Sequence, residues 1–187
     1  FHYVGVDPQT GIYQFEDVDG NGSISSPADL QGIKKVGQIF HGGISNSFQY
    51  QNWSLDIFVQ FAKQTNYNYV SAYFPAPGRM NNQPIFVLDR WQDPGDITSI
   101  QKFTQNTTSE ANRAYVNSQS NGDNSISDAS FIRLKNLSLS YNLPFLWMMK
   151  NHLKGGKVYI QGQNLLTLTR YKGMDPESGH FGYIPPL

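Results

Sequence analysis

The sequence contains no cysteine and no long apolar run. Without cysteine the chain can form no disulfide, no thiolate nucleophile and no cysteine-ligated zinc site. Its longest uninterrupted apolar run is Phe145–Met149, far shorter than the roughly 18 residues that a membrane-spanning helix needs. Spanning helices are therefore excluded. Membrane-crossing β-strands stay open, because each needs only about 9–11 residues of alternating pattern.

Charge is also scarce. Charged residues are 15% of the 187 residues, where soluble domains average about 25%. Neutral polar residues replace them, with 16 Asn, 15 Gln and 17 Ser, and aromatics reach 14%. Fourteen basic residues balance fourteen acidic ones, so no net field attracts nucleic acid. We therefore expect no nucleic-acid partner.

Catalytic motifs are missing as well. The four histidines stand apart with no H-E-x-x-H spacing, and the sequence has neither G-x-S-x-G nor a phosphate-binding P-loop. A carboxylate pair for glycoside hydrolysis could only be chosen arbitrarily, because a sequence gives no separation between side chains. We expect no enzymatic activity and assign no catalytic or cofactor-binding residue.

The clearest periodic pattern predicts a hairpin over residues 39–63. In Trp53–Lys63 five apolar residues fall on alternate positions, and only Phe58 breaks the polar face between them. A weaker alternation over Phe40–Tyr50 precedes it, and Gln51-Asn52 separates the two runs. This arrangement is typical of a tight β-hairpin.

A second strand pair is predicted over residues 130–169. Leucine and tyrosine alternate with small polar residues in Asn136–Leu143, and Lys157–Thr169 alternates in the same way. Phe131–Lys135 has apolar residues on both parities, which predicts a bulge or a shift in environment in that stretch. Residues 1–38, 64–129 and 170–187 are then long connections. Long loops that alternate with short ones are typical of a bacterial outer-membrane barrel.

Two stretches give the sequence a family resemblance. Asp128–Pro144 (DASFIRLKNLSLSYNLP) and Val158–Glu177 (VYIQGQNLLTLTRYKGMDPE) resemble the carboxy-terminal part of SusC/RagA-type TonB-linked outer-membrane transporters of the Bacteroidota. Asp17–Gly22 (DVDGNG) and the Gly42-Gly43 pair followed by Trp53 resemble earlier segments of the same family, in the same order. The resemblance thus covers nearly the whole chain.

The resemblance implies a fold and a function. The chain would be an all-β, antiparallel transmembrane β-barrel fragment of about four strands with long extracellular loops, and the final closing strand of the family would be absent. The family members import oligosaccharides or peptides across the outer membrane, with a SusD-like surface lipoprotein as lid and energy from TonB. The TonB-contacting regions of the family lie upstream of the part that this sequence resembles.

The residues by themselves leave a soluble carbohydrate-binding β-sandwich open, because such modules are also built from alternating strands. Loop aromatics can likewise be interpreted in two ways: Tyr67, Tyr69, Tyr73 and Phe74 could stack on sugar rings, or they could pack their loop against its neighbours. In a barrel, other aromatics would anchor the strand ends at the membrane surfaces, whereas in a sandwich the same residues would pack in the core or at an edge. These are Tyr50, Trp53, Tyr141, Tyr159 and Tyr171.

The first connection contains a candidate calcium loop. From Asp17 onward it matches the first nine positions of an EF-hand loop, with Gly at the sharp turn. The second half departs from the pattern, because Ala28 replaces the bidentate Glu and Asp29 comes one residue later. An ordinary turn that bonds its own backbone is the alternative. The candidate ligands are Asp17, Asp19, Asn21, Ser23, Ser25 and Asp29.

Loop lengths also predict an orientation. If the closing strand of the family runs from the outside of the cell to the periplasm, the short connections at residues 51–52 and 154–156 lie in the periplasm. Residues 1–38, 64–129 and 170–187 then lie outside the cell, and the lipid surrounds the strands.

Overall fold

The computed structural model describes residues 1–68, 75–173 and 175–178. The chain folds into two compact units. One unit comprises residues 1–36 and 65–127, and the other comprises residues 37–64 and 128–187. Among the described residues, no helix has the length and apolar character required to cross a membrane.

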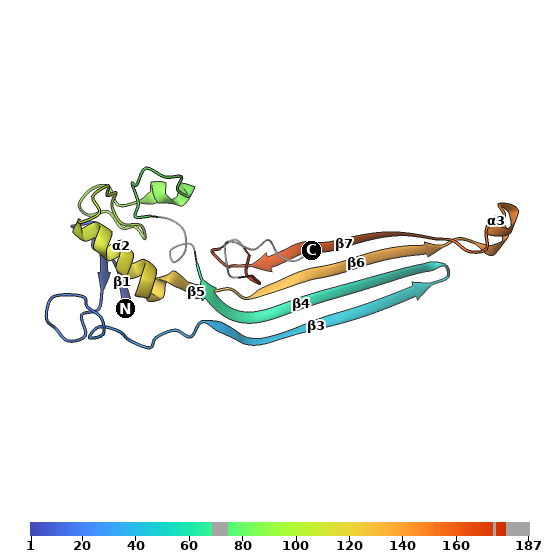
Figure 1. Cartoon of the computed structure of the whole chain (residues 1–187), viewed down its shortest axis with the longest axis horizontal. Coiled ribbons are helices and arrows are strands. Elements are labelled where there is room, and N and C mark those ends of the chain that lie inside the picture. The colour runs from blue at the N-terminus through green and yellow to red at the C-terminus, as the bar shows by residue number, and fades with distance from the viewer. Residues whose placement is uncertain (69–74, 174, 179–187) are drawn as a thin grey trace. The chain divides into compact units, whose positions relative to one another are not determined.

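The second unit is an antiparallel sheet of long strands (Figure 1). The predicted set of about four such strands is confirmed, and their order in the sheet is β3-β4-β6-β7. A two-residue turn joins the first two strands, and Gln51 adopts a positive φ of 52° there. The short strand β5 (Ile126–Asp128) pairs with β4. The long strands are β3 (Gly37–Tyr50), β4 (Trp53–Tyr67), β6 (Phe131–Asn142) and β7 (Lys157–Thr169).

The expected bulge lies at Lys135. In the register between β4 and β6, Phe58 is opposite Asn136 and Val59 is opposite Leu134, so Lys135 has no partner in β4. The register between β6 and β7 shifts at the same place. One extra residue reverses the side-chain parity of β6. This reversal explains why Phe131–Lys135 does not alternate in phase with the rest of the strand.

Two adjacent glycines let aromatic rings cross β3 on both faces of the sheet. A Cβ atom at Gly42 would lie 2.6 Å from the ring of Phe61, and one at Gly43 would lie 2.6 Å from the ring of Phe58. Neither position can therefore hold a side chain without moving a ring. Phe58, which breaks the alternation of β4, is accommodated by Gly43 on the polar face.

The first unit has more regular structure than its sequence predicts. A small antiparallel sheet pairs β1 (Tyr3–Val6) with β2 (Tyr13–Phe15). Helix α2 (Glu110–Asn121) begins after Ser109, whose side chain accepts a hydrogen bond from the backbone N–H of Asn112. The described residues of this unit also form two short 3-10 helices, η1 (Ile85–Asp89) and η2 (Asp123–Ser125).

Aromatic side chains form the core of this first unit. Tyr13 packs edge-on against Tyr3 at a centroid distance of 5.3 Å and stacks on Tyr115 of α2 at 6.2 Å. Ala76 and Ala114 complete the buried cluster. Burial raises the pKa of Tyr3 and of Tyr115 to about 12, so both phenols stay protonated at neutral pH.

Candidate functional site

One face of the long sheet is apolar along its whole length. The strand registers place the alternating apolar residues of β4, β6 and β7 opposite one another. Several of these side chains are open to the surroundings, including Ile132 at 53%, Leu168 at 58% and Ile160 at 72% exposed. The members of this apolar face are Leu55, Ile57, Val59, Phe61, Ile132, Leu134, Leu137, Leu139, Val158, Ile160, Leu166 and Leu168. A continuous face of this kind requires an apolar medium or another protein layer.

Aromatic residues flank the apolar face only in part. Trp53 and Tyr141 are opposite each other in the register, with ring centroids 4.7 Å apart, at the end of the sheet near the β3–β4 turn. Tyr159 was expected to belong with them, and this expectation is wrong. It lies opposite Ser140 on the polar face, because Val158 and Ile160 point to the apolar side.

The other face of the sheet is polar. Ser138 lies between Asp56 of β4 and Gln161 of β7, and Asn136 lies between Phe58 and Gln163. The side chain of Ser47 in β3 donates a hydrogen bond to Asp56. The sheet therefore separates an apolar surface from a hydrogen-bonding one, which is the arrangement that a barrel wall needs between lipid and an aqueous lumen.

A buried arginine holds several polar groups together at one end of the polar face, and no pattern in the sequence indicated it. The side chain of Arg133 is only 2% exposed, yet it contacts Asp175 at 2.7 Å and Glu177 at 2.6 Å. Its Nε atom donates a 2.9 Å hydrogen bond to the hydroxyl of Thr167. Lys135, at the bulge, adds a 3.0 Å contact to Glu177. We call Arg133, Lys135, Asp175 and Glu177 the arginine cluster.

The arginine cluster attaches the segment after β7 to the sheet. The amide of Gln64 in β4 donates to the carbonyl of Pro176, between the two acidic residues. Three side chains from β4 and β6 therefore hold a short stretch of chain against the polar face. Since the ion pairs are largely shielded from water, they are less weakened by salt than surface pairs are.

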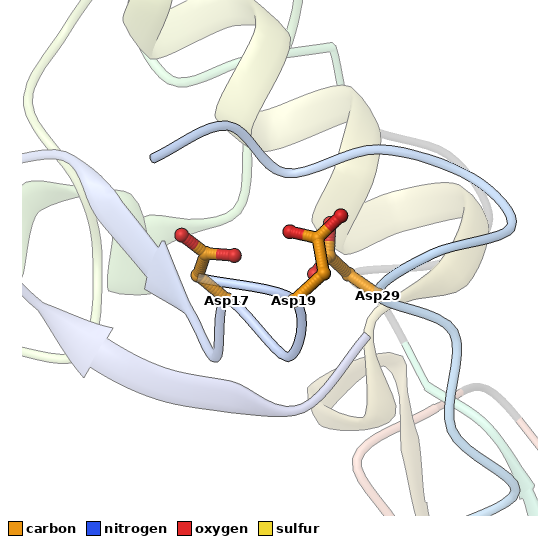
Figure 2. A group of neighbouring side chains, drawn as sticks. All are labelled: Asp17, Asp19 and Asp29. Carbon is orange, nitrogen blue, oxygen red and sulfur yellow. The ribbon is translucent and has the colours of Figure 1, made fainter. Parts of the chain in front are cut away.

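Three carboxylates of the candidate calcium loop converge. Asp17, Asp19 and Asp29 each place one oxygen within 4.8 Å of the others (Figure 2). Asp29 is fully buried, Asp17 is half-buried and Asp19 is exposed. Three negative charges this close repel one another, and a bound divalent cation would relieve the repulsion. Asp29 thus joins the cluster, although it lies one residue after the position of the last ligand in an EF-hand loop.

The same carboxylates also bond to the backbone. Asp17 accepts from the N–H groups of Gly20 and Gly22 at 2.8 and 2.7 Å. Asp29 accepts from Ser25 and Val18, and these hydrogen bonds hold its pKa below the ordinary value. Asp29 is therefore ionised at neutral pH. A charged oxygen is what a hard cation such as calcium needs in a ligand.

The remaining candidate ligands are placed by their own hydrogen bonds. The side-chain oxygen of Asn21 accepts from the backbone N–H of Ser23 at 2.8 Å, and its amide donates to Asp19 at 2.7 Å. Ser25 contributes its backbone N–H to Asp29. These bonds match the ordinary turn that the sequence left as the alternative to calcium, so the geometry fits both interpretations.

The loop aromatics can be followed at one position only. Tyr67 is the last residue of β4 and is 43% exposed. Tyr69, Tyr73 and Phe74 lie outside the described residues. Stacking of these rings on a substrate therefore stays a prediction from the sequence.

Comparison with curated proteins finds several relatives, although no protein-family model matches the chain. TonB-dependent receptor P3 of Formosa agariphila is 32% identical over 175 residues, which are 93% of this chain and 16% of the receptor. TonB-dependent receptor SusC of Bacteroides thetaiotaomicron is 28% identical over 166 residues, which are 87% of this chain and 15% of SusC. The chain thus spans about a sixth of the length of these relatives.

Comparison with solved structures also finds outer-membrane transport proteins. The RagAB peptide importer in its "open-open" state matches with a TM-score of 0.72 and 27% identity, over 95% of this chain and 19% of that chain. The "closed-closed" state matches with a TM-score of 0.70 at the same identity, over 95% and 20%. The predicted barrel-fragment fold and the outer-membrane location are confirmed. The chain is a homologue, over nearly its whole length, of the TonB-dependent receptors of the SusC/RagA family, which are proteins of the outer membrane.

Proposed function

We propose that this chain contributes four adjacent wall strands to a TonB-dependent importer of oligosaccharides or peptides. The observation that carries the proposal is the apolar face, which continues across β4, β6 and β7 and is backed by a polar face. In a barrel wall the first face contacts lipid and the second lines the lumen. The match to the RagAB peptide importer supports this assignment.

The proposed partners follow from the relatives. A surface lipoprotein of the SusD type would cover the barrel, and TonB would supply energy through regions of the importer other than the one that this chain matches. The relatives are TonB-dependent receptors, and the matching solved structure is a peptide importer. We infer a role in transport without catalysis.

A soluble carbohydrate-binding β-sandwich is the competing function, and the exposure of the apolar face argues against it. In a sandwich, a second sheet buries the apolar side of the first one. Here Ile160 and Val158 are 72% and 60% exposed. A soluble module would leave such a surface in water, where it would aggregate.

The proposal is tested by deleting the gene of the complete receptor. We expect the strain to lose growth on one class of nutrient, oligosaccharides or peptides, and to keep growth on the corresponding monosaccharides or amino acids. Deletion of TonB should give the same loss. Recovery of the receptor from the soluble fraction, without detergent, would instead support the β-sandwich.

The predicted orientation can be tested by labelling. We expect a cysteine at Asn106, in the long connection, to react with a membrane-impermeant maleimide on intact cells. A cysteine at Asn52, in the two-residue turn, should react only after the outer membrane is permeabilised. Labelling at Asn52 but not at Asn106 on intact cells would show that the orientation is the opposite of the predicted one.

We also propose a weak calcium site in the first connection, supported by the convergence of Asp17, Asp19 and Asp29. Because the ligand set departs from a complete EF-hand loop, the dissociation constant should lie in the range of about 10⁻⁴–10⁻³ M. At such an affinity calcium outside the cell would order the loop without regulating transport.

Calcium binding is tested on the complete receptor. Asp19→Asn should weaken binding about tenfold in a calorimetric titration, because it removes one charged ligand. Asp7→Asn is the matched control, since Asp7 also caps a turn, through the N–H of Gln9, and lies outside the cluster. If both variants and the parent receptor gave the same calcium titration, the proposed site would be refuted.

A further inference from the structure

The connection between β6 and β7 forms a small apolar turn at one end of the sheet. It contains helix α3 (Phe145–Lys150), which lies beyond the strand ends in Figure 1. The apolar side chains of this turn are strongly exposed: Phe145 68%, Leu146 80%, Trp147 50%, Met149 57% and Leu153 45%. The described residues thus cover little of them, and water is a poor environment for such a cluster.

This turn has a defined fold. After α3, the backbone N–H groups of Asn151, His152 and Leu153 all donate to carbonyls within the helix. His152 takes a positive φ of 57°, which reverses the chain and ends the helix. Leu143 donates to the carbonyl of Gly156 and closes the base of the turn. The exposed side chains are therefore presented by a hydrogen-bonded structure.

The charge of the same turn has one sign. From Pro144 to Lys157 the sequence contains three lysines, Lys150, Lys154 and Lys157, and no acidic residue. The rest of the chain carries the opposite excess, with eleven basic and fourteen acidic residues. Apolar side chains combined with uncompensated lysines are typical of segments that lie in a membrane surface, where acyl chains take the apolar groups and anionic headgroups take the lysines.

The turn also continues the apolar face. Tyr141 of β6 and Val158 of β7 are opposite each other on the apolar side, next to the two ends of the turn. Trp53 packs against Tyr141 at this end of the sheet. The apolar surface therefore extends from the strands toward α3 through a border of aromatic rings, as expected at the edge of a lipid bilayer.

We propose that the turn of residues 144–157 is a membrane-surface anchor that binds anionic phospholipid. The apolar side chains of α3 enter the boundary between headgroups and acyl chains, and the lysines bind phosphate groups. The occupant is the phospholipid leaflet at the short-turn end of the sheet. The anchor fixes the depth at which β6 and β7 cross the membrane, a role beyond the proposed import function.

Lipid quenching tests the anchor in the complete receptor. A single cysteine at Leu146 is labelled with bimane, and the receptor is reconstituted in vesicles of phosphatidylethanolamine and phosphatidylglycerol. We expect phospholipids brominated near the carbonyl end to reduce the bimane fluorescence at least about twofold, because the label sits at that depth. The matched control is bimane at Asn52, in the polar turn at the same end of the sheet, where we expect little quenching.

The lysines are tested in the same assay. Lys150→Glu combined with Lys154→Glu should reduce the quenching at Leu146 about twofold or more in vesicles rich in phosphatidylglycerol. Replacement of the same lysines by arginine should preserve it. Gel mobility of the unheated receptor confirms that each variant has folded.

Three results would overturn the proposal. One is equal quenching at Leu146 and Asn52. Another is shielding of the bimane at Leu146 that occurs only after a periplasmic protein extract is added, which would identify a protein as the occupant of α3. The third is unchanged quenching in the glutamate variants, which would refute the binding of anionic headgroups.

Discussion

Removal of both carboxylates of the arginine cluster, by Asp175→Ala with Glu177→Ala, should lower the free energy of unfolding of the receptor by about 3–5 kcal/mol. The reason is the burial of Arg133, whose side chain is 2% exposed. Without its partners the guanidinium keeps its charge but loses the groups that compensate for desolvation. A chemical unfolding titration of the refolded receptor in detergent measures the change.

Two further variants separate this effect from general damage to the sheet. Lys63→Ala breaks the ion pair between Lys63 and Asp128, whose two side chains are 43% and 55% exposed. This substitution should lower the free energy of unfolding by at most about 1 kcal/mol. Adding Arg133→Met to the double variant should recover part of the lost stability, because the buried charge is then gone. If the third substitution lowers stability further, the loss does not come from the unpaired guanidinium.

Ile57→Lys should destabilise the receptor by about 2–4 kcal/mol. Ile57 lies in the middle of the apolar face, opposite Leu137 of β6. A lysine there would place a charge near the midplane of the bilayer. Refolding into lipid vesicles at a series of denaturant concentrations measures the difference from the parent receptor.

Ser138→Lys is the matched control for this substitution. Ser138 is one residue along from the partner of Ile57 and lies opposite Asp56 on the polar face. The new lysine would be hydrated in the lumen and could pair with that aspartate, so we expect a much smaller cost. Equal costs for the two variants would contradict the assignment of the faces.

The sheet could be predicted because its pattern is local. Trp53–Lys63 and Asn136–Leu143 alternate clearly, and a period of two determines which side chains share a face. The mixed parity of Phe131–Lys135 also indicated the bulge, which the registers place at Lys135. The interaction of Gly42 and Gly43 with rings of β4 was not predicted, since it depends on cross-strand register.

Helix α2 was missed because its pattern is weak. Its buried residues are Ala111, Ala114, Tyr115 and Ser118, which follow helical spacing but are mostly small. The signal that could have found it is the cap, in which Ser109 precedes Glu110 at the start of that spacing. The helix also contains several asparagines and serines, which are typical of loops, so the sequence favoured a loop over a helix here.

The candidate calcium loop could be recognised in the sequence and the arginine cluster could not, because only the first is a local pattern. Asp17, Asp19 and Asn21 are close in sequence, so their loop is recognisable as a candidate ligand set. The partners of Arg133 lie 42 and 44 residues further along the chain. No local pattern links them, and only the path of the chain after β7 brings them to the polar face.

The central claim is that this chain is a segment of an outer-membrane barrel wall. Electron cryomicroscopy of the complete receptor, extracted from the outer membrane, tests it most directly. We predict a closed barrel in which β3, β4, β6 and β7 are neighbouring strands, with Leu55, Ile57 and Val59 facing the detergent belt. A soluble particle in which a second sheet covers those three residues would contradict the claim.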